Sequence, residues 1–321
     1  MQKRCMYRLC KLSSLFFCHQ VHENKDPLNI ETVMSTLHTN GYYTGMVGKY
    51  LNSWAGEARA EFNYWVSFKA GESAYKDPVL NVNGEWGMHP GYITYILSDY
   101  AIEFLDKASK QTEPFLLIFA PNAPHTPATP AEEDLPLYDQ LPDYSVPSLN
   151  EEDTSDKPTS ISRKQLLNAD ELKLLDDKRR REILTLVSLD RKIGEILDKL
   201  KETGKLDNTV IIFISDNGLH WGEHRMDSKS TFYEESAHVP FALRYPALVP
   251  TPYVEDRLVA NIDIAPTLYE LAGINIPYRV DGKSLLDLFE PGKKWRDHRR
   301  PKQALTSRMP LPATNPPAAR C

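Results

Sequence analysis

Cysteine is scarce in this sequence and is confined to its two ends. The 321 residues contain 4 cysteines, at positions 5, 10, 18 and 321, so no disulfide framework staples the interior. No Asn-x-Ser/Thr sequon is present, which argues mildly against a glycosylated secreted protein. No apolar run is long enough to span a bilayer. Basic residues number 38 against 44 acidic ones, and the net charge of -6 gives no support for nucleic-acid binding.

The chain does contain enough apolar material for a full core, because 41% of its residues are hydrophobic. Its length favours two domains, although one large α/β domain is also normal. Apolar runs at 115–120 and 210–214 predict buried strands, the latter buried on both faces, and the 3.6-residue periodicity at 95–105 and 171–203 predicts helices. Because strands alternate with helices, we expect an α/β fold with a mainly parallel central sheet flanked by helices.

The N-terminal half and the region after 240 add shorter elements. The spacing of apolar residues predicts a helix from Ile30 that stops at Asn40-Gly41, followed by a strand over 42–47. Asn83-Gly84 predicts a hairpin turn. A further strand is expected over 241–244, and the Pro-, Asp-, Glu- and Ser-rich stretch 128–170 reads as a surface loop.

Polar residues follow the apolar run 210–214 at once. Asp216 offers a hard anionic oxygen and Asn217 a neutral carbonyl oxygen, a pair that suits Ca²⁺ or Mg²⁺ better than zinc. Gly218 lets the backbone turn sharply, and Lys229 is a point charge suited to sulfate or phosphate. Ligands of open α/β sheets lie beyond the carboxyl ends of strands, so the position fits a binding site. An Asx-type turn with solvated histidines is the alternative, because Asn-Gly is a common turn dipeptide.

The longer pattern is more specific. S-D-N-G-x-H-x-G-E-H, followed by K-x-x-x-Y-E and V-P, resembles the late active-site segment of the sulfatase family within the alkaline-phosphatase-like superfamily. The glucosamine-6-sulfatase and heparan-sulfatase branch looks closest, and G-K-Y-L-N at 48–52 and P-H-x-P around His125 agree with it. The resemblance extends from about His22 to Leu286 and implies an alkaline-phosphatase-like fold.

The resemblance also implies roles for single residues. It makes Lys49 and Lys229 sulfate-contacting catalytic side chains and His125 a catalytic histidine that also helps the leaving oxygen. A solvated loop lysine and a structural loop histidine are the alternatives for Lys49 and His125. The full set comprises three catalytic residues, one substrate contact and two metal ligands for one divalent cation, Ca²⁺: Lys49, His125, Lys229; His220; Asp216, Asn217.

Both ends of the chain depart from the family pattern. Sulfatases make a formylglycine nucleophile from the cysteine of C-x-P-S-R, and here Cys10-Lys11-Leu12-Ser13-Ser14 matches only the cysteine and the first serine. Formylglycine is therefore not supported, and we expect Cys10 to be unmodified. The family's first strand and its two metal-binding aspartates have no counterpart, so the cation should bind weakly. We expect a divergent segment over 1–21, a partial sulfatase-like domain over 22–289 that lacks the C-terminal subdomain, and a disordered basic, Pro-rich tail over 290–321.

Two functions from different classes follow. The first is a sulfuric ester hydrolase acting on a sulfated sugar such as N-acetylglucosamine 6-sulfate of a glycosaminoglycan. The second is an inactive sulfatase fragment or pseudoenzyme that at most binds anionic glycans, and a phosphodiesterase of the superfamily is a weaker third. The partner expected is a sulfated carbohydrate, with no nucleic acid and with the oligomeric state open. The family is lysosomal or secreted, although the N-terminus is a poor signal peptide.

Overall fold

The computed structural model describes residues 31–229, 231–290, 292–293 and 295. Its centre is a five-stranded sheet in the order β4-β3-β2-β1-β5. β1 (Tyr43–Gly48) pairs in parallel with β2 (Tyr64–Ser67) on one side and with β5 (Phe115–Ala120) on the other. β3 (Val79–Val82) and β4 (Glu85–Met88) extend the sheet beyond β2 as antiparallel strands.

The sheet is therefore mixed, whereas the sequence predicted a mainly parallel one. The predicted hairpin explains the difference, because a two-residue turn can join only antiparallel strands. Asn83 and Gly84 have φ values of 53° and 103°, as the left-handed positions of such a turn require. The α/β class, with helices flanking a central sheet, is confirmed.

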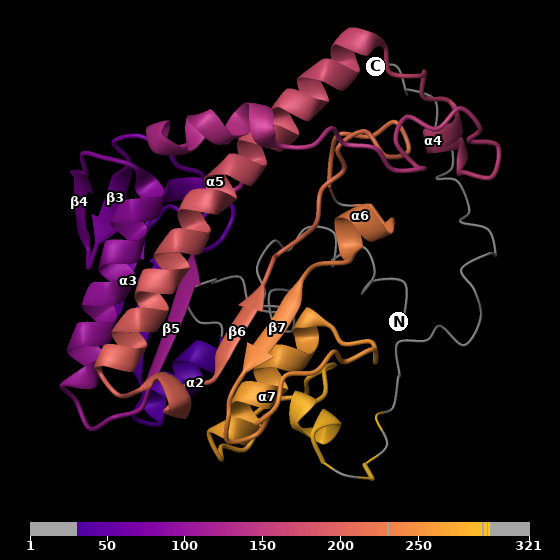
Figure 1. Cartoon of the computed structure of the whole chain (residues 1–321). Coiled ribbons are helices and arrows are strands. Elements are labelled where there is room, and N and C mark those ends of the chain that lie inside the picture. Colours follow the sequence, from indigo (N-terminus) through magenta and orange to yellow (C-terminus); the bar gives the residue numbers. More distant parts are fainter. Residues whose placement is uncertain (1–30, 230, 291, 294, 296–321) are drawn as a thin grey trace, which may run out of the picture.

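β6 (Ile211–Ile214) and β7 (Phe241–Arg244) form a separate antiparallel pair. β5 ends the larger sheet, β6 lies close to it in space, and no ladder joins the two among the described residues (Figure 1). The prediction that this run is buried on both faces was wrong: β6 is half-buried, and Phe213 is 50% exposed. The physical reason is that burial of a strand's two faces depends on segments packed over them from elsewhere in the chain, and those near Phe213 leave half of it exposed.

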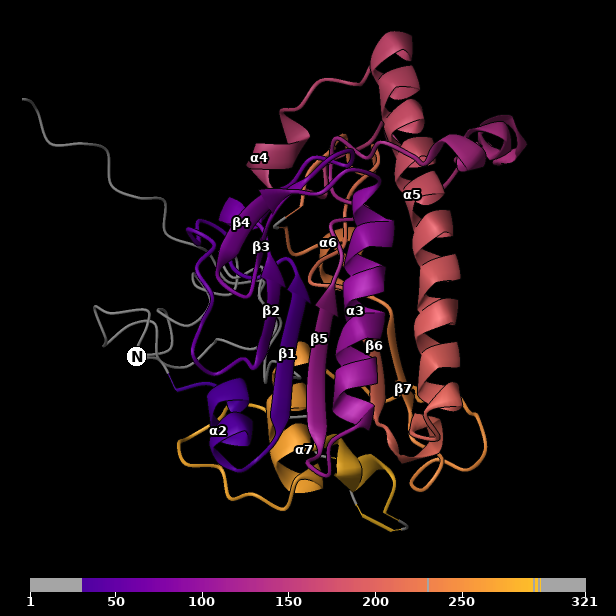
Figure 2. The same cartoon turned by 90° about the vertical axis from the view of Figure 1, so that its left-hand side faces the viewer.

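Helices cover both faces of the larger sheet (Figure 2). α3 (Ile93–Ser109) and α5 (Ala169–Glu202) pack side by side on one face, and α2 (Val33–Thr39) and α7 (Ile264–Leu271) pack on the other. Side chains of β1 alternate between the two cores, as the two-residue period of a strand requires: Val47 joins the first and Met46 the second. The helices and strands predicted from apolar periodicity are confirmed at these places.

α5 is the longest helix described, with 34 residues. Its N-cap is Asn168, whose side chain accepts hydrogen bonds from the N–H groups of Asp170 and Glu171, while the Glu171 carboxylate accepts one from the N–H of Asn168. The helix ends shortly before Gly204, which has a φ of +67°. Charged residues line much of it, and no helix in the described part of the chain is both long and apolar enough to cross a membrane. The predicted segment 1–21 and almost all of the predicted tail lie outside the described residues.

Candidate active site

Lys49 stands where two strands come close together. β1 ends at Gly48, which has a φ of +113°, and an added Cβ there would lie 2.0 Å from the carbonyl oxygen of Ala120. The next N–H, that of Lys49, donates to the same oxygen over 2.6 Å. Only glycine allows this approach, so the lysine leaves the sheet at the carboxyl ends of β1 and β5. Ligands of α/β proteins bind at this edge.

Asp216 reaches Lys49 from the other sheet. Its Oδ2 lies 3.9 Å from Nζ of Lys49, and the two side chains are 30% and 13% exposed. The ends of β1 and β6 therefore converge even though the two strands belong to different sheets. The contact is long for an ion pair, and both side chains are partly shielded from water.

Lys229 lies close enough to act on the charge of Lys49. Burial is the largest cause that lowers the pKa of Lys49, the carboxylates of Asp216 and Glu72 oppose it, and the positive charge of Lys229 lowers it further. Two ammonium groups near one another repel, and an anion placed between them would relieve that repulsion. Sequence reasoning missed Glu72, which belongs to an irregular loop without a motif and is exposed at the edge of the site.

The turn after β6 is fixed by backbone contacts. The Ser215 hydroxyl donates to the carbonyl of Asn217 over 2.8 Å, and the side-chain amide of Asn217 donates to the carbonyl of Gly218 over 3.0 Å. Gly218 N–H donates to the carbonyl of Ser236 over 2.9 Å, and a Cβ on Gly218 would meet the carbonyl oxygen of Glu235 at 2.1 Å. The Asn217 amide nitrogen is used in this turn, and its oxygen is the atom that would ligate a cation.

His125 lies in the loop that follows β5. The Tyr75 hydroxyl donates to its backbone carbonyl over 2.7 Å, and its Nδ1 is 2.9 Å from the carbonyl of Thr126. The loop is thus anchored to the same sheet edge as Lys49. The structure brings Lys49 and Asp216 into contact, with Lys229 near enough for its charge to lower the pKa of Lys49. His125 lies in the loop after the neighbouring strand β5. Its catalytic role stays a prediction.

His220 is fully buried at 0% exposure. Its Nε2 lies 2.8 Å from Oγ1 of Thr231, its Nδ1 has no hydrogen-bond partner, and burial is the main cause that lowers its pKa. The imidazole is therefore neutral near pH 7 and turned away from solvent. Its predicted role as a substrate contact stays a prediction, and the hydrogen bonds suggest a different use.

The residues present do not fit a complete calcium site. Ca²⁺ takes roughly six to eight oxygen ligands, several of them anionic. Asp216 and Asn217 offer side-chain oxygens, but no group of three or more His, Cys, Asp or Glu side chains that could hold a metal occurs within the described ranges. The carboxylate of Asp216 already has the ammonium of Lys49 beside it. Cys10, the nearest candidate for a formylglycine precursor, lies outside the described residues.

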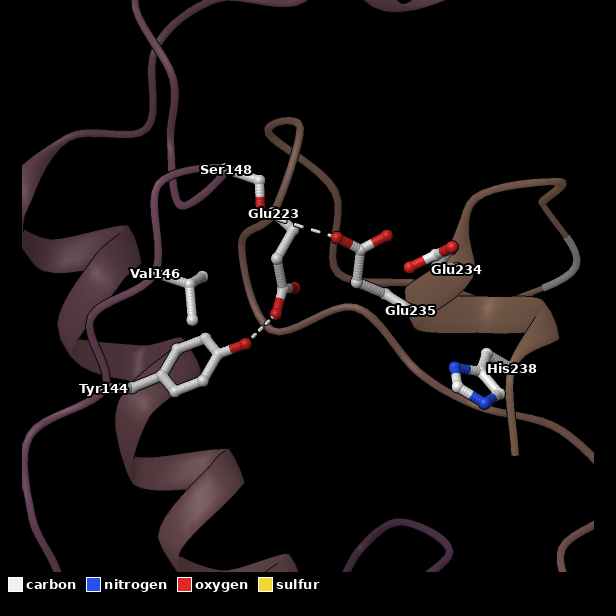
Figure 3. A pocket seen from close by; sticks show the side chains of 7 residues that line it. All are labelled: Tyr144, Val146, Ser148, Glu223, Glu234, Glu235 and His238. Atoms are coloured by element: carbon white, nitrogen blue, oxygen red, sulfur yellow. Dashed lines mark hydrogen bonds between the residues drawn. The ribbon is translucent and has the colours of Figure 1, made fainter. Parts of the chain in front are cut away.

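An acidic pocket of about 360 Å³ opens beside the turn (Figure 3). Residues from three segments line it: Tyr144, Val146, Ser148, Glu223, Glu234, Glu235 and His238. The Tyr144 hydroxyl donates to Glu223, and the Ser148 hydroxyl donates to Glu235 over 3.4 Å. The backbone of Glu235 also touches Gly218, which joins the pocket to the turn that carries Asp216. No motif in the 128–170 loop identified Tyr144 or Ser148 as residues of this region.

Comparison with known proteins gives the class. The sulfatase family model matches residues 9–274. A solved structure of BT4656 in complex with its substrate, D-glucosamine-2-N,6-O-disulfate, aligns with a TM-score of 0.73 at 22% identity, covering 92% of this chain and 76% of that one. The crystal structure of the "putative sulfatase yidJ" from Bacteroides fragilis aligns with a TM-score of 0.69 at 22% identity, covering 84% of this chain and 62% of that one. The fold is that of the sulfatases.

Curated relatives lie in the same group. The chain is 31% identical over 288 residues to a protein of Caenorhabditis elegans named "Putative extracellular sulfatase Sulf-1 homolog", covering 87% of this chain and 40% of that protein. It is 30% identical over 272 residues to the N-acetylglucosamine-6-sulfatase of Homo sapiens, covering 80% and 49%. The chain belongs to the sulfatase family, and it spans about half the length of the curated relatives it matches.

Proposed function

We propose that this chain binds the sulfate group of a sulfated sugar between Lys49 and Lys229 and acts in hydrolysis of that sulfate ester. The observation that carries the proposal is the contact between Lys49, after β1, and Asp216, after β6, with Lys229 near enough for its charge to lower the pKa of Lys49. A glucosamine residue sulfated at its 6-oxygen, such as N-acetylglucosamine 6-sulfate of a glycosaminoglycan, is the substrate proposed. Relatives named N-acetylglucosamine-6-sulfatase support that choice.

The chemistry asks for charge neutralisation and for help to the leaving oxygen. A sulfate monoester carries negative charge that shifts toward the bridging oxygen as the ester bond breaks, and fixed ammonium groups stabilise that change. Lys49 and Lys229 are suited to the non-bridging oxygens. His125, held by its backbone at the same sheet edge, would donate a proton to the departing alcohol.

Calcium and formylglycine are features of the sulfatase family, and the proposal for this chain does not depend on either of them. Bound Ca²⁺ would add further positive charge at the sulfate, with Asp216 and Asn217 as its ligands in this chain. Because these residues do not complete a calcium site, we assign no step to the metal or to a formylglycine.

A second function, sulfate binding without turnover, is favoured by one observation. Lys49 lies within 3.9 Å of Asp216 and so occupies part of the space that a cation ligated by this carboxylate would need. In this form the chain is a sulfatase-like protein that binds anionic glycans. The extracellular name of one relative supports a secreted or lysosomal setting for either function.

One experiment separates the alternatives. Turnover of an aryl sulfate and of N-acetylglucosamine 6-sulfate is measured with and without Ca²⁺, and binding of inorganic sulfate is measured by calorimetry. We expect sulfate binding that falls at least tenfold in Lys49→Ala and in Lys229→Ala, with Lys110→Ala, at the far end of α3, as a matched control. Turnover lost in Asp216→Ala establishes the hydrolase, and binding without turnover establishes the second function. Absence of sulfate binding in the parent chain refutes both.

A further inference from the structure

The segment that carries Lys229 has no helix or strand among its described residues. It leaves β6 at Ser215 and reaches α6 (Glu234–Ala237) through an irregular loop. Backbone hydrogen bonds hold the loop in narrow pairs: Gly222 N–H donates to Met226 over 2.7 Å, and His220 N–H donates to Ser228 over 3.1 Å. The bond from His220 is the last of these before Lys229, so it sets where the lysine backbone begins.

The side chain of the same histidine holds the other flank of Lys229. Nε2 of His220 lies 2.8 Å from Oγ1 of Thr231. Thr231 N–H donates to the hydroxyl of Ser236 over 3.2 Å, and its own Oγ1 accepts from Tyr233 N–H over 3.4 Å. His220 therefore bonds to the chain on both sides of Lys229, at Ser228 through its backbone and at Thr231 through its side chain. The bond from Thr231 N–H to Ser236 links the second contact to α6.

The imidazole is itself fixed by packing. It is fully buried, and its ring centre lies 6.2 Å from that of His224 and 6.1 Å from that of Tyr233. His224 in turn is held through its Nδ1, 2.7 Å from a carboxylate oxygen of Glu151. A ring that is packed in this way cannot rotate outward to contact a substrate. Its hydrogen bond to Thr231 fixes the position of the loop relative to the ring.

The grip opposes an electrostatic force. The positive charge of Lys229 lowers the pKa of Lys49, so the two ammonium groups repel each other. Without an anion between them, repulsion drives the more loosely held lysine outward. Lys49 is fixed by the end of β1, whereas Lys229 lies on a loop. The bonds from His220 lie on both sides of Lys229 and oppose this movement.

We infer that His220 is a positioning residue that holds Lys229 against Lys49, and that it does not touch the sulfate. The inference rests on the proposed function, because it assigns a role within the same anion site. Losing the side-chain bond frees the Lys229 segment to move away from Lys49. The cost then appears as weaker sulfate binding, and it appears only while Lys229 is present.

The test compares variants of the two bonded residues in the full chain. Calorimetry with inorganic sulfate is expected to show a loss of about tenfold for His220→Ala and for Thr231→Val, since each removes the hydrogen bond between His220 and Thr231. Thr231→Val also removes the longer bond from Tyr233 N–H. The double variant should lose no more than either single one. Thr231→Ser, which keeps the hydroxyl, and His220→Gln, whose amide reaches the same place, should bind nearly as the parent does. Thr231→Val keeps the test open if His220→Ala fails to fold.

Two controls make the result specific. His38→Gln alters another histidine, which bonds to Thr44 at the opposite end of β1, and it should leave sulfate affinity unchanged. In a Lys229→Ala background, His220→Ala should cause no further loss. An undiminished loss in that background, or parental affinity in folded His220→Ala, overturns the inference.

Hydrogen exchange separates this inference from the proposed function. If the parent chain binds no sulfate, the proposed function fails, yet the grip can still be measured. Amide exchange over 218–233 should quicken in His220→Ala and in Thr231→Val and stay slow in Thr231→Ser. Unchanged exchange in the first two variants shows that His220 does not hold the loop.

Discussion

Replacing Gly218 by alanine should destabilise the protein and break the site at once. The new Cβ would lie 2.1 Å from the carbonyl oxygen of Glu235 and 3.3 Å from the carbonyl carbon of Ser236. Both neighbours are backbone atoms, so the two segments must separate by about 1 Å before the contact is tolerable, with an overpacking cost of roughly 1–3 kcal/mol. The bond from Gly218 N–H to Ser236, 2.9 Å long, is lost in that movement and adds about 1 kcal/mol.

The expected loss of unfolding free energy is therefore about 2–4 kcal/mol, which for a domain of this size lowers the melting temperature by roughly 3–8 °C. Differential scanning calorimetry and urea denaturation measure it. Gly194→Ala is the matched control: no atom lies within 4 Å of its added Cβ, and alanine in the interior of α5 should stabilise by about 0.5–1 kcal/mol. A Gly218→Ala protein that melts within about 1 °C of the parent would refute the steric argument.

Three further outcomes can be checked. Burial lowers the pKa of His220 against the opposing charges of Glu235 and Glu223, so on acidification the unfolded chain takes up the proton before the folded one. The free energy of unfolding should therefore fall as the pH drops below about 6.5. Urea denaturation at several pH values should show a smaller dependence of unfolding free energy on pH in His220→Gln. Asn168→Ala removes the cap of α5 and should cost about 1 kcal/mol in urea denaturation, with no loss of sulfate affinity as the check on specificity. Phe213, 50% exposed on the open side of β6, should promote association, so Phe213→Thr should reduce light scattering on concentration; equal scattering would count against the exposed edge as the cause.

Much of the fold follows from the letters alone. The apolar run before Pro121 and the periodicities of α3 and α5 predicted their elements to within a few residues, because burial of one face imposes a period that the sequence must carry. Asn83-Gly84 predicted its hairpin because few other residues adopt two left-handed positions in succession. These are local or nearly local causes, and a single sequence records them.

Which strands pair with one another cannot be predicted from such local signals. The run 210–214 looks like an interior strand, yet β6 pairs only with β7, and its burial depends on neighbours from distant parts of the chain. The proximity of Lys49 to Asp216 likewise exists because two sheet edges meet, a relation that spacing along the chain cannot express.

The sequence by itself determined the family, several of the main helices and strands, and the kinds of charged side chain available for the site, since composition, periodicity and motifs reside in the order of residues. Only the tertiary structure decided which of those side chains meet. The tertiary structure buried the His220 side chain and placed it beside Thr231, because side-chain burial depends on segments packed from elsewhere in the chain. It also set Lys49 against Asp216 and Lys229, because electrostatic interaction depends on distance in space and not on distance along the chain.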